Sequence, residues 1–247
     1  MAAQNKIALI TGANRGIGLE TARQLGQQGY TVLVAARSLE KAEGAVTELK
    51  TQGIERAVPL ALDVSDDASV QAAAAEVTEK FGKLDALVNN AGIITGEEFF
   101  GNSVADVALD AIEETFDVNL LGVIRTTRAF LPLLEKSDAG RIVNLTSILG
   151  SLTLHATEDS PIYNSKSFAY NASKAALNMY TIHLAHALAD TSIKVNAAHP
   201  GWVQTDMGGE QAPMDIVKGA KTSVDLATLG EDGPSGAYIH LGDTLPW

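Results

Sequence analysis

The sequence of 247 residues contains no cysteine. This absence excludes disulfide bonds, thiolate nucleophiles and cysteine-ligated metal sites. Basic residues are also scarce, because 18 lysines and arginines against 30 aspartates and glutamates give a formal net charge of -12. Nucleic acids and anionic membranes bind basic surfaces, so neither is expected as a partner.

Long hydrophobic runs are missing as well. No segment has the roughly 20 consecutive apolar residues that a membrane-spanning helix needs, and the start Met-Ala-Ala-Gln-Asn-Lys lacks the apolar stretch of a signal peptide. We therefore expect a soluble, cytoplasmic protein. Hydrophobic residues still make up 46% of the chain, enough for a sizeable core.

Short β-branched runs alternate with amphipathic, alanine-rich stretches, which is typical of βαβ units around a parallel sheet. Ser38 and either Ser65 or Asp66 are candidate helix caps. No repeat or low-complexity linker divides the chain, so we predict one doubly wound, Rossmann-like α/β domain over residues 1–247 with about seven strands. The predicted strands are 6–11, 31–36, 57–63, 86–89, 141–146, 194–199 and 237–241. The predicted helices are 17–28, 39–52, 66–81, 104–134, 168–190 and 215–229.

Residues 201–233 form the least regular region and follow a predicted strand. Ligands bind outside the carboxyl ends of strands in open α/β sheets, so this segment is either a substrate lid or a surface excursion without a catalytic role. We expect loops near 93–103, 148–168 and 202–230 to shape the substrate pocket.

A glycine-rich turn joins the first strand to the first helix, with the sequence Thr11-Gly12-Ala13-Asn14-Arg15-Gly16-Ile17-Gly18. Glycines at such a turn let the backbone approach a pyrophosphate, whose charge the helix N-terminus favours. Three residues separate Gly12 from Gly16, which departs from the usual G-x-G-x-x-G spacing. Ordinary turn chemistry is the alternative.

Arg37 directly follows the second predicted strand, and no acidic residue lies at the end of that strand. An acid near this position commonly holds the ribose 2′-hydroxyl of NAD, whereas a basic residue accommodates the 2′-phosphate of NADP. Arg15 and Arg37 together suit a phosphate by charge and by forked geometry, although Arg37 is alternatively a solvated residue before the Ser38 cap. In an acidic chain we favour NADP.

Two further strand ends fall on the same predicted sheet edge. Asp63-Val64 follows the third strand, where the carboxylate could accept a hydrogen bond from an adenine amino group. Asn89-Asn90-Ala91-Gly92 ends the fourth, where small residues would let the backbone pass close to a cofactor. Each segment is alternatively a turn or a helix cap.

Tyr170 and Lys174 lie four positions apart at the start of a long predicted helix. Residues at this spacing share one helix face, with Cβ atoms roughly 5–6 Å apart. An adjacent ammonium favours the phenolate, so we expect Lys174 to lower the phenol pKa from about 10 and make Tyr170 a proton donor and acceptor. The alternative is that this spacing occurs by chance, with a tyrosine on the core side of the helix and a solvated lysine beside it.

Taken together, these motifs resemble the short-chain dehydrogenase/reductase family: T-G-x-x-x-G-x-G at Thr11–Gly18, N-N-A-G at Asn89–Gly92, Y-x-x-x-K at Tyr170–Lys174, and Pro200-Gly201 after the sixth strand. The resemblance runs nearly end to end. It implies Tyr170 as acid/base, Lys174 as its partner and ribose ligand, Ser147 as hydrogen-bond donor to the substrate oxygen, and Asn119 as anchor of a water that links Lys174 to solvent. It also implies cofactor contacts from Gly12, Asn14, Arg15, Gly16, Ile17, Gly18, Arg37, Asp63, Val64, Asn90, Ala91, Gly92, Tyr170, Lys174, Pro200, Gly201, Val203 and Thr205.

A second tyrosine and lysine, in Tyr163-Asn164-Ser165-Lys166, lie closer together and before the predicted helix, so Tyr170 is the better candidate. Ser147 and Tyr170 are then separated by the 22 residues 148–169, more than is usual in the family. Longer insertions there resemble carbonyl-reductase-like members, some of them monomers, so we expect a monomer or small homo-oligomer. Trp202 and Met207 line an apolar pocket in that interpretation, or pack into the core.

The sequence therefore predicts an oxidoreductase, a NADPH-dependent carbonyl reductase or ketoreductase that transfers hydride reversibly between NADP(H) and a ketone or aldehyde. A 3-oxoacyl thioester reductase acting on an acyl carrier protein is the alternative enzyme, and a non-catalytic NADP-binding regulator is the alternative of another class. His183 and His186 are three apart but have no convincing third ligand, so no metal site is predicted.

Overall fold

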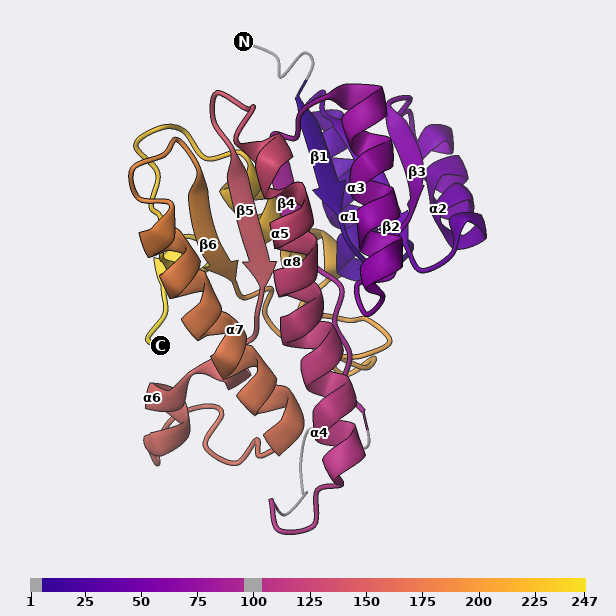
Figure 1. The fold of residues 1–247 in the computed structure, drawn as a ribbon. Helices are drawn as coiled ribbons and strands as arrows, with labels where there is room; N and C mark the ends of the chain where they lie inside the picture. The colour runs from indigo at the N-terminus through magenta and orange to yellow at the C-terminus, as the bar shows by residue number, and fades with distance from the viewer. Residues whose placement is uncertain (1–5, 96–103) are drawn as a thin grey trace.

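The computed structural model describes residues 6–95 and 104–247, and it is built on one twisted sheet (Figure 1). The strands run in the order β3-β2-β1-β4-β5-β6-β7-β8, and only β8 is antiparallel to its neighbour. The first six strands have the order of a dinucleotide-binding fold, which confirms the predicted Rossmann-like class. The strands are β1 (Ile7–Ile10), β2 (Thr31–Ala36), β3 (Ala57–Ala61), β4 (Ala86–Asn89), β5 (Arg141–Leu145), β6 (Lys194–Ala198), β7 (Tyr238–His240) and β8 (Asp243–Thr244).

The eighth strand exceeds the predicted seven. It has two residues and follows a tight turn in which Leu241 and Gly242 both have positive φ, 48° and 95°. Such a short strand carries no periodicity of its own, which is why the sequence pattern does not reveal it.

Helices cover both faces of the sheet (Figure 1). In the described chain α3, α5 and α7 pack on one face, while α1, α2 and α8 pack on the other. The helices are α1 (Gly16–Gln27), α2 (Leu39–Thr51), α3 (Asp67–Phe81), α4 (Leu109–Phe116), α5 (Gly122–Leu134), α6 (Leu152–Ala156), α7 (Phe168–Ala187) and α8 (Ile216–Ala227). Two short helical turns complete them, the π-turn η1 (Asp117–Leu121) and the 3-10 turn η2 (Ile148–Gly150).

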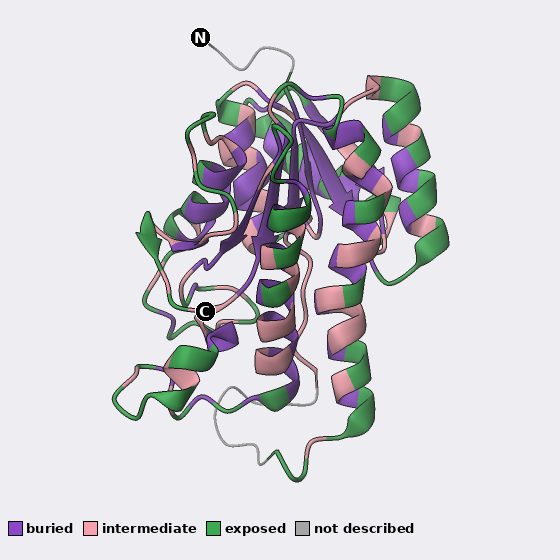
Figure 2. Ribbon diagram, turned by 60° about the vertical axis from the view of Figure 1, so that its left-hand side comes forward, coloured by how far each residue is buried: buried purple, intermediate pink, exposed green. Residues whose placement is uncertain are grey.

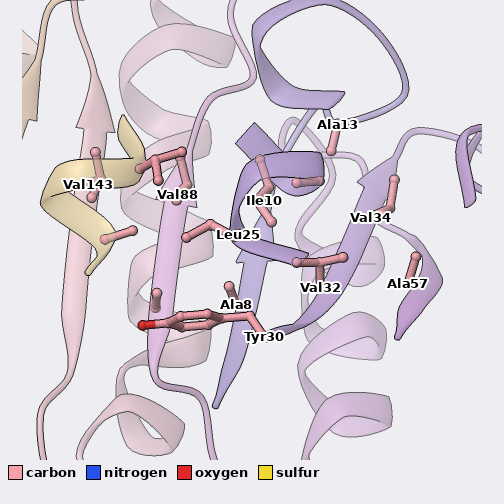
Figure 3. Packing of buried hydrophobic residues seen from close by; sticks show 14 of the residues in the cluster. Ala8, Ile10, Ala13, Leu25, Tyr30, Val32, Val34, Ala57, Val88 and Val143 are labelled. Atoms are coloured by element: carbon pink, nitrogen blue, oxygen red, sulfur yellow. The ribbon is translucent and has the colours of Figure 1, made fainter. Parts of the chain in front are cut away.

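The core follows from the alternation of side chains along each strand. In β1, Ala8 and Ile10 point toward α1, whereas Ile7 and Leu9 point to the other face. Figure 3 shows Ala8, Ile10, Val32, Val34 and Val88 gathered around Leu25 of α1. The strands are buried along most of their length, and exposed residues lie on the outer faces of the helices (Figure 2).

Local signals position several helices as predicted. Ser38 caps α2 by accepting a hydrogen bond from the Lys41 amide at 3.4 Å. For α3 the cap is Asp66 rather than Ser65, with the Ala68 amide at 2.9 Å. A side-chain oxygen at these positions satisfies an otherwise unpaired amide of the first turn.

The predicted helix 104–134 begins later, at Leu109, and η1 interrupts it between α4 and α5. The extra residue of a π-turn shifts the helical register, and such turns often occur at functional sites. Residues 96–103 of the predicted loop 93–103 lie outside the described residues. In the two described ranges, no helix combines the length and apolarity needed to cross a membrane.

Because β1 to β6 are all parallel, their carboxyl ends meet at one sheet edge. The strand order reverses between β1 and β4, the point at which open α/β sheets bind ligands.

Candidate active site

A cleft of about 470 Å³ follows this edge. Sixteen of the eighteen residues predicted to contact a cofactor line it, and the two exceptions are Gly201 and Val203. Val203 is buried against α8, since a Cβ on Gly219 of that helix would lie 2.7 Å from a methyl group of Val203. Gly201 has a φ of 94° and faces Met214 and His240. The cleft is also lined by residues that the sequence analysis did not assign to it: Leu62, Ser65, Ile93, Val118, Leu145, Thr146, Gln204, Asp206 and Ile216.

Two glycines of the β1–α1 turn are required by geometry. Gly12 has a φ of 63°, and a Cβ there would lie 3.0 Å from the Ala91 backbone. A Cβ on Gly18 would lie 2.6 Å from the Gly12 carbonyl oxygen. The missing side chains let the turn pack closely against the residues after β4 and against itself, beside the N-terminus of α1, where an anion is favoured.

Residues after β4 hold the β1–α1 turn in place through hydrogen bonds. The Thr11 hydroxyl accepts hydrogen bonds from the Asn90 and Ala91 amides at 3.0 Å, and the Asn90 side chain donates to the Thr11 and Gly12 carbonyls at 2.8 and 3.2 Å. Asn89 faces the core and donates to Asn144 and Thr127. Asn90 thus holds the β1–α1 turn, and Asn89 links β4 to β5 and α5. Of the two, only Asn90 lines the cleft.

A second, shallower depression of about 400 Å³ adjoins the cleft beside α2. Arg15, Arg37 and Lys41 bring three cations to it, with Glu48 as the one acid. Lys41 was not predicted, although its position four residues after Arg37 in the first turn of α2 is a usable signal. Arg15 also pairs with Asp206 from the segment after β6, so an acid lies beside the predicted phosphate site.

Tyr170 and Lys174 share the buried face of α7. The Lys174 Nζ lies 5.6 Å from the Tyr170 ring centroid and donates to the Leu145 carbonyl oxygen at 2.9 Å. Burial lowers the pKa of Lys174 to about 8. Burial raises the pKa of Tyr170 to about 12, although a hydrogen bond with the Ser147 side chain opposes the rise.

The predicted acidification of Tyr170 by Lys174 is therefore wrong for this structure. Both groups lie in a site of low polarity, where desolvation disfavours the phenolate and the ammonium alike. A phenol with a pKa of about 12 is protonated at neutral pH.

Ser147 follows β5 and caps η2, where its hydroxyl accepts a hydrogen bond from the Leu149 amide at 3.2 Å. Its side chain is also hydrogen-bonded to Tyr170. The predicted serine and tyrosine are thus in contact despite the 22 residues between them.

Asn119 lies buried in η1. Its side chain exchanges two hydrogen bonds of 2.8 Å with the Ile93 backbone and donates to the Ser173 hydroxyl at 3.1 Å. It therefore ties the segment after β4 to α7, one residue before Lys174.

The second tyrosine and lysine lie away from this site. The Lys166 Nζ is 4.9 Å from the Tyr163 ring centroid and donates to the His155 Nδ1 at 3.2 Å. The other ring nitrogen of His155 contacts the Leu149 carbonyl oxygen at 2.9 Å, so both nitrogens are engaged.

Apolar side chains gather on the Tyr170 side of the site. Leu149, Ile162 and Tyr170 form a buried cluster, with Ile94, Ile148 and Leu154 packed against it. Trp202 is 49% exposed, which excludes the core alternative, and its indole N–H donates to the Gly208 carbonyl at 2.7 Å. Met207 lines the cleft.

Comparisons with known proteins agree with this geometry. A family model described as short chain dehydrogenase matches residues 6–215. The chain is 41% identical to the short-chain dehydrogenase anuI of Penicillium roqueforti over 237 residues, covering 93% of this chain and 92% of that protein. Among solved structures it resembles an NADPH-bound carbonyl reductase from chicken fatty liver, with a TM-score of 0.85, 29% identity and 99% and 100% of the two chains covered. It also resembles a 3-oxoacyl-[acyl-carrier protein] reductase from Brucella melitensis, with a TM-score of 0.82, 30% identity and 97% and 91% covered.

Proposed function

The chain belongs to the short-chain dehydrogenase family, and from this premise we propose that it is an NADPH-dependent reductase of ketones or aldehydes in which Tyr170 donates the proton. The observation that carries this proposal is the hydrogen-bonded pair of Ser147 and Tyr170, with the buried Lys174 beside it, at a cleft along the carboxyl ends of the strands.

The residues of the cleft fit NADP(H). The β1–α1 turn would receive the pyrophosphate at the N-terminus of α1. Glycines at positions 12 and 18 permit this turn, because a Cβ there would collide with the Ala91 backbone or with the Gly12 carbonyl oxygen. Arg15, Arg37 and Lys41 would hold the 2′-phosphate. Each guanidinium group can donate two parallel hydrogen bonds to phosphate oxygens, and the lysine adds a positive charge. Lys174 would hold the nicotinamide ribose. The related chicken carbonyl reductase is described as NADPH-bound.

NADPH, when bound, supplies the hydride. As the carbonyl carbon of the substrate is reduced, negative charge grows on its oxygen, and the Ser147 hydroxyl donates a hydrogen bond to that oxygen. The Tyr170 hydroxyl then transfers its proton to it. The raised pKa of Tyr170 suits reduction, because it keeps the phenol protonated, and an alkoxide is a far stronger base than a phenolate.

The surroundings of Tyr170 favour a neutral, apolar carbonyl substrate. The cluster of Leu149, Ile162 and Tyr170 supplies an apolar wall. A phosphopantetheine carrier would require basic residues near the site, whereas the α6–α7 segment presents the exposed acids Glu158 and Asp159. The acidic residues argue against an acyl carrier protein reductase, but the resemblance to the Brucella enzyme makes this activity the second candidate.

The test is NADPH oxidation, followed by absorbance, with a panel of aryl ketones, aldehydes and an acyl-carrier substrate. We expect turnover of the ketones, and a Tyr170→Phe variant that loses at least about 100-fold in kcat while still binding NADPH. Preference for the acyl-carrier substrate would support the second candidate. NADPH binding without oxidation by any carbonyl would favour the non-catalytic regulator.

A further inference from the structure

One peptide group, between Ser147 and Ile148, is held at both ends by buried side chains from elsewhere in the sheet. The Tyr238 hydroxyl donates to the Ser147 carbonyl oxygen at 2.5 Å. The Ile148 amide donates to the His199 Nδ1 at 3.1 Å. Because a peptide group is planar and rigid, two contacts at its opposite ends fix its orientation.

Both side chains are themselves fixed. Tyr238 is fully buried in β7, and its ring stacks on Trp247 with centroids 5.2 Å apart. His199, immediately after β6, is 7% exposed, and its Nδ1 also accepts from the Gly201 amide at 3.4 Å. Two amides directed at Nδ1 require that nitrogen to be unprotonated.

The neighbouring His240 reinforces this state of His199. The two rings lie 4.7 Å apart, and the His240 Nδ1 donates to the His199 carbonyl oxygen at 2.9 Å. Burial, with His240 beside it, lowers the pKa of His199 to about 3, so the ring stays neutral at physiological pH. His199 thus offers a permanent acceptor.

We propose that His199 and Tyr238 are positioning residues for Ser147, and that they act through the Ser147–Ile148 peptide in the reaction proposed above. Ser147 lies on a short turn after β5, so the direction of its hydroxyl depends on the orientation of this peptide. A displacement of about 1 Å at a reacting group can cost on the order of 100-fold in rate. The residues at the end of β6 and in β7 thus fix the backbone of Ser147 relative to the sheet.

Three variants test the two contacts separately. Tyr238→Phe removes only the hydroxyl. His199→Leu and His199→Asn have the same branched shape, but only asparagine keeps an acceptor near the Nδ1 position. We expect Tyr238→Phe and His199→Leu to lower kcat about 10-fold with the KM for NADPH changed less than about twofold, and His199→Asn to restore most of the loss. Tyr180→Phe is the matched control, because Tyr180 lies about 15 Å further along α7 from Tyr170.

The same substitutions in a Ser147→Ala background identify the route of action. Residues that act through Ser147 have no further effect on kcat once its hydroxyl is gone. Equal losses in both backgrounds, or unchanged kcat in Tyr238→Phe and His199→Leu, would overturn the proposal.

Amide hydrogen exchange provides a readout that does not depend on activity. We expect the Ile148 amide to exchange faster in His199→Leu than in His199→Asn or the unmodified protein. An unchanged rate refutes the contact even if carbonyl reduction is confirmed. Faster exchange in a protein that reduces no carbonyl supports the contact and refutes the proposed function.

Discussion

At the residue scale, burial governs the two titratable groups of the site. It raises the pKa of Tyr170 to about 12 and lowers that of Lys174 to about 8, so each group is held closer to its neutral form. The phenol is thereby kept protonated, as the proposed reaction requires. Burial also destabilises the folded protein, because Lys174 is 4% exposed and charged at neutral pH.

Lys174→Met measures that cost. At pH 7 we expect the variant to lose turnover and to gain roughly 2 kcal/mol in free energy of unfolding, after allowance for the lost hydrogen bond to Leu145. The folded pKa of Lys174 lies below its unfolded value of 10.5, so the unfolded chain binds more protons between about pH 8 and pH 10.5. Stability from this group therefore rises with pH across that window, and the advantage of the variant disappears.

Urea unfolding of both proteins at pH 7 and pH 10.5 checks this expectation. Lys166→Met is the control, since Lys166 is exposed and should change neither turnover nor stability by a comparable amount. A Lys174→Met variant less stable than the unmodified protein at pH 7 would contradict the account of burial.

Arg37 is expected to select the cofactor. Arg37→Asp replaces a guanidinium beside the proposed 2′-phosphate site with a carboxylate that repels phosphate and can bind ribose hydroxyls. We expect the NADPH/NADH ratio of kcat/KM to fall by about 100-fold, which corresponds to roughly 2.7 kcal/mol. Arg56→Asp makes the same charge change at an exposed position outside the cleft, and an equal fall there would exclude a specific role for Arg37.

At the scale of elements, the segment between β5 and α7 joins the site to the surface. η2 carries Ser147 at its start, α6 and Ile162 supply the apolar cluster, and the loop between them presents Glu158 and Asp159. One segment thus contributes a catalytic candidate, a pocket wall and a charged rim.

Reversing the charge of this rim tests the choice of substrate. In Glu158→Lys/Asp159→Lys we expect kcat/KM for an acyl-carrier substrate to rise several-fold, because an acidic carrier is then attracted, while rates on neutral ketones change less than about twofold. Glu135→Lys/Asp138→Lys gives the same change of charge before β5, at the opposite sheet edge. Equal gains from both pairs would show a general effect of net charge on carrier binding.

At the scale of the whole molecule, an acidic protein must bind an anionic cofactor. The formal charge of -12 makes the overall electrostatic field unfavourable for an anion. The proposed binding of the 2′-phosphate therefore depends on the local cations Arg15, Arg37 and Lys41 beside the cleft.

Thermal unfolding with cofactor tests this arrangement. A ligand present at 100 times its Kd stabilises the folded state by about 2.7 kcal/mol, which for a chain of this size raises Tm by about 5–10 °C. We expect such a rise with NADP and less than half of it with NAD at equal concentration. Equal rises with both would mean that the three cations do not bind the 2′-phosphate.

The sequence by itself determined the fold class, the position of most elements and sixteen of the residues that line the cleft. These follow from local patterns: alternating apolar residues specify strands, side chains such as Ser38 cap helices, and motifs at strand ends meet because parallel strands end at one edge. The roles given to Ser147, Tyr170, Lys174 and Asn119 remain predictions of that kind.

Only the tertiary structure decided the long-range contacts of these residues and the pKa values of the buried ones. The ion pair of Arg15 and Asp206 joins positions 191 apart, and Tyr238 reaches the Ser147 peptide across 91. The pKa of Tyr170 rises because packed neighbours remove water, a property of its surroundings in space. Such effects depend on which segments pack together, and the spacing of residues along the chain does not encode them.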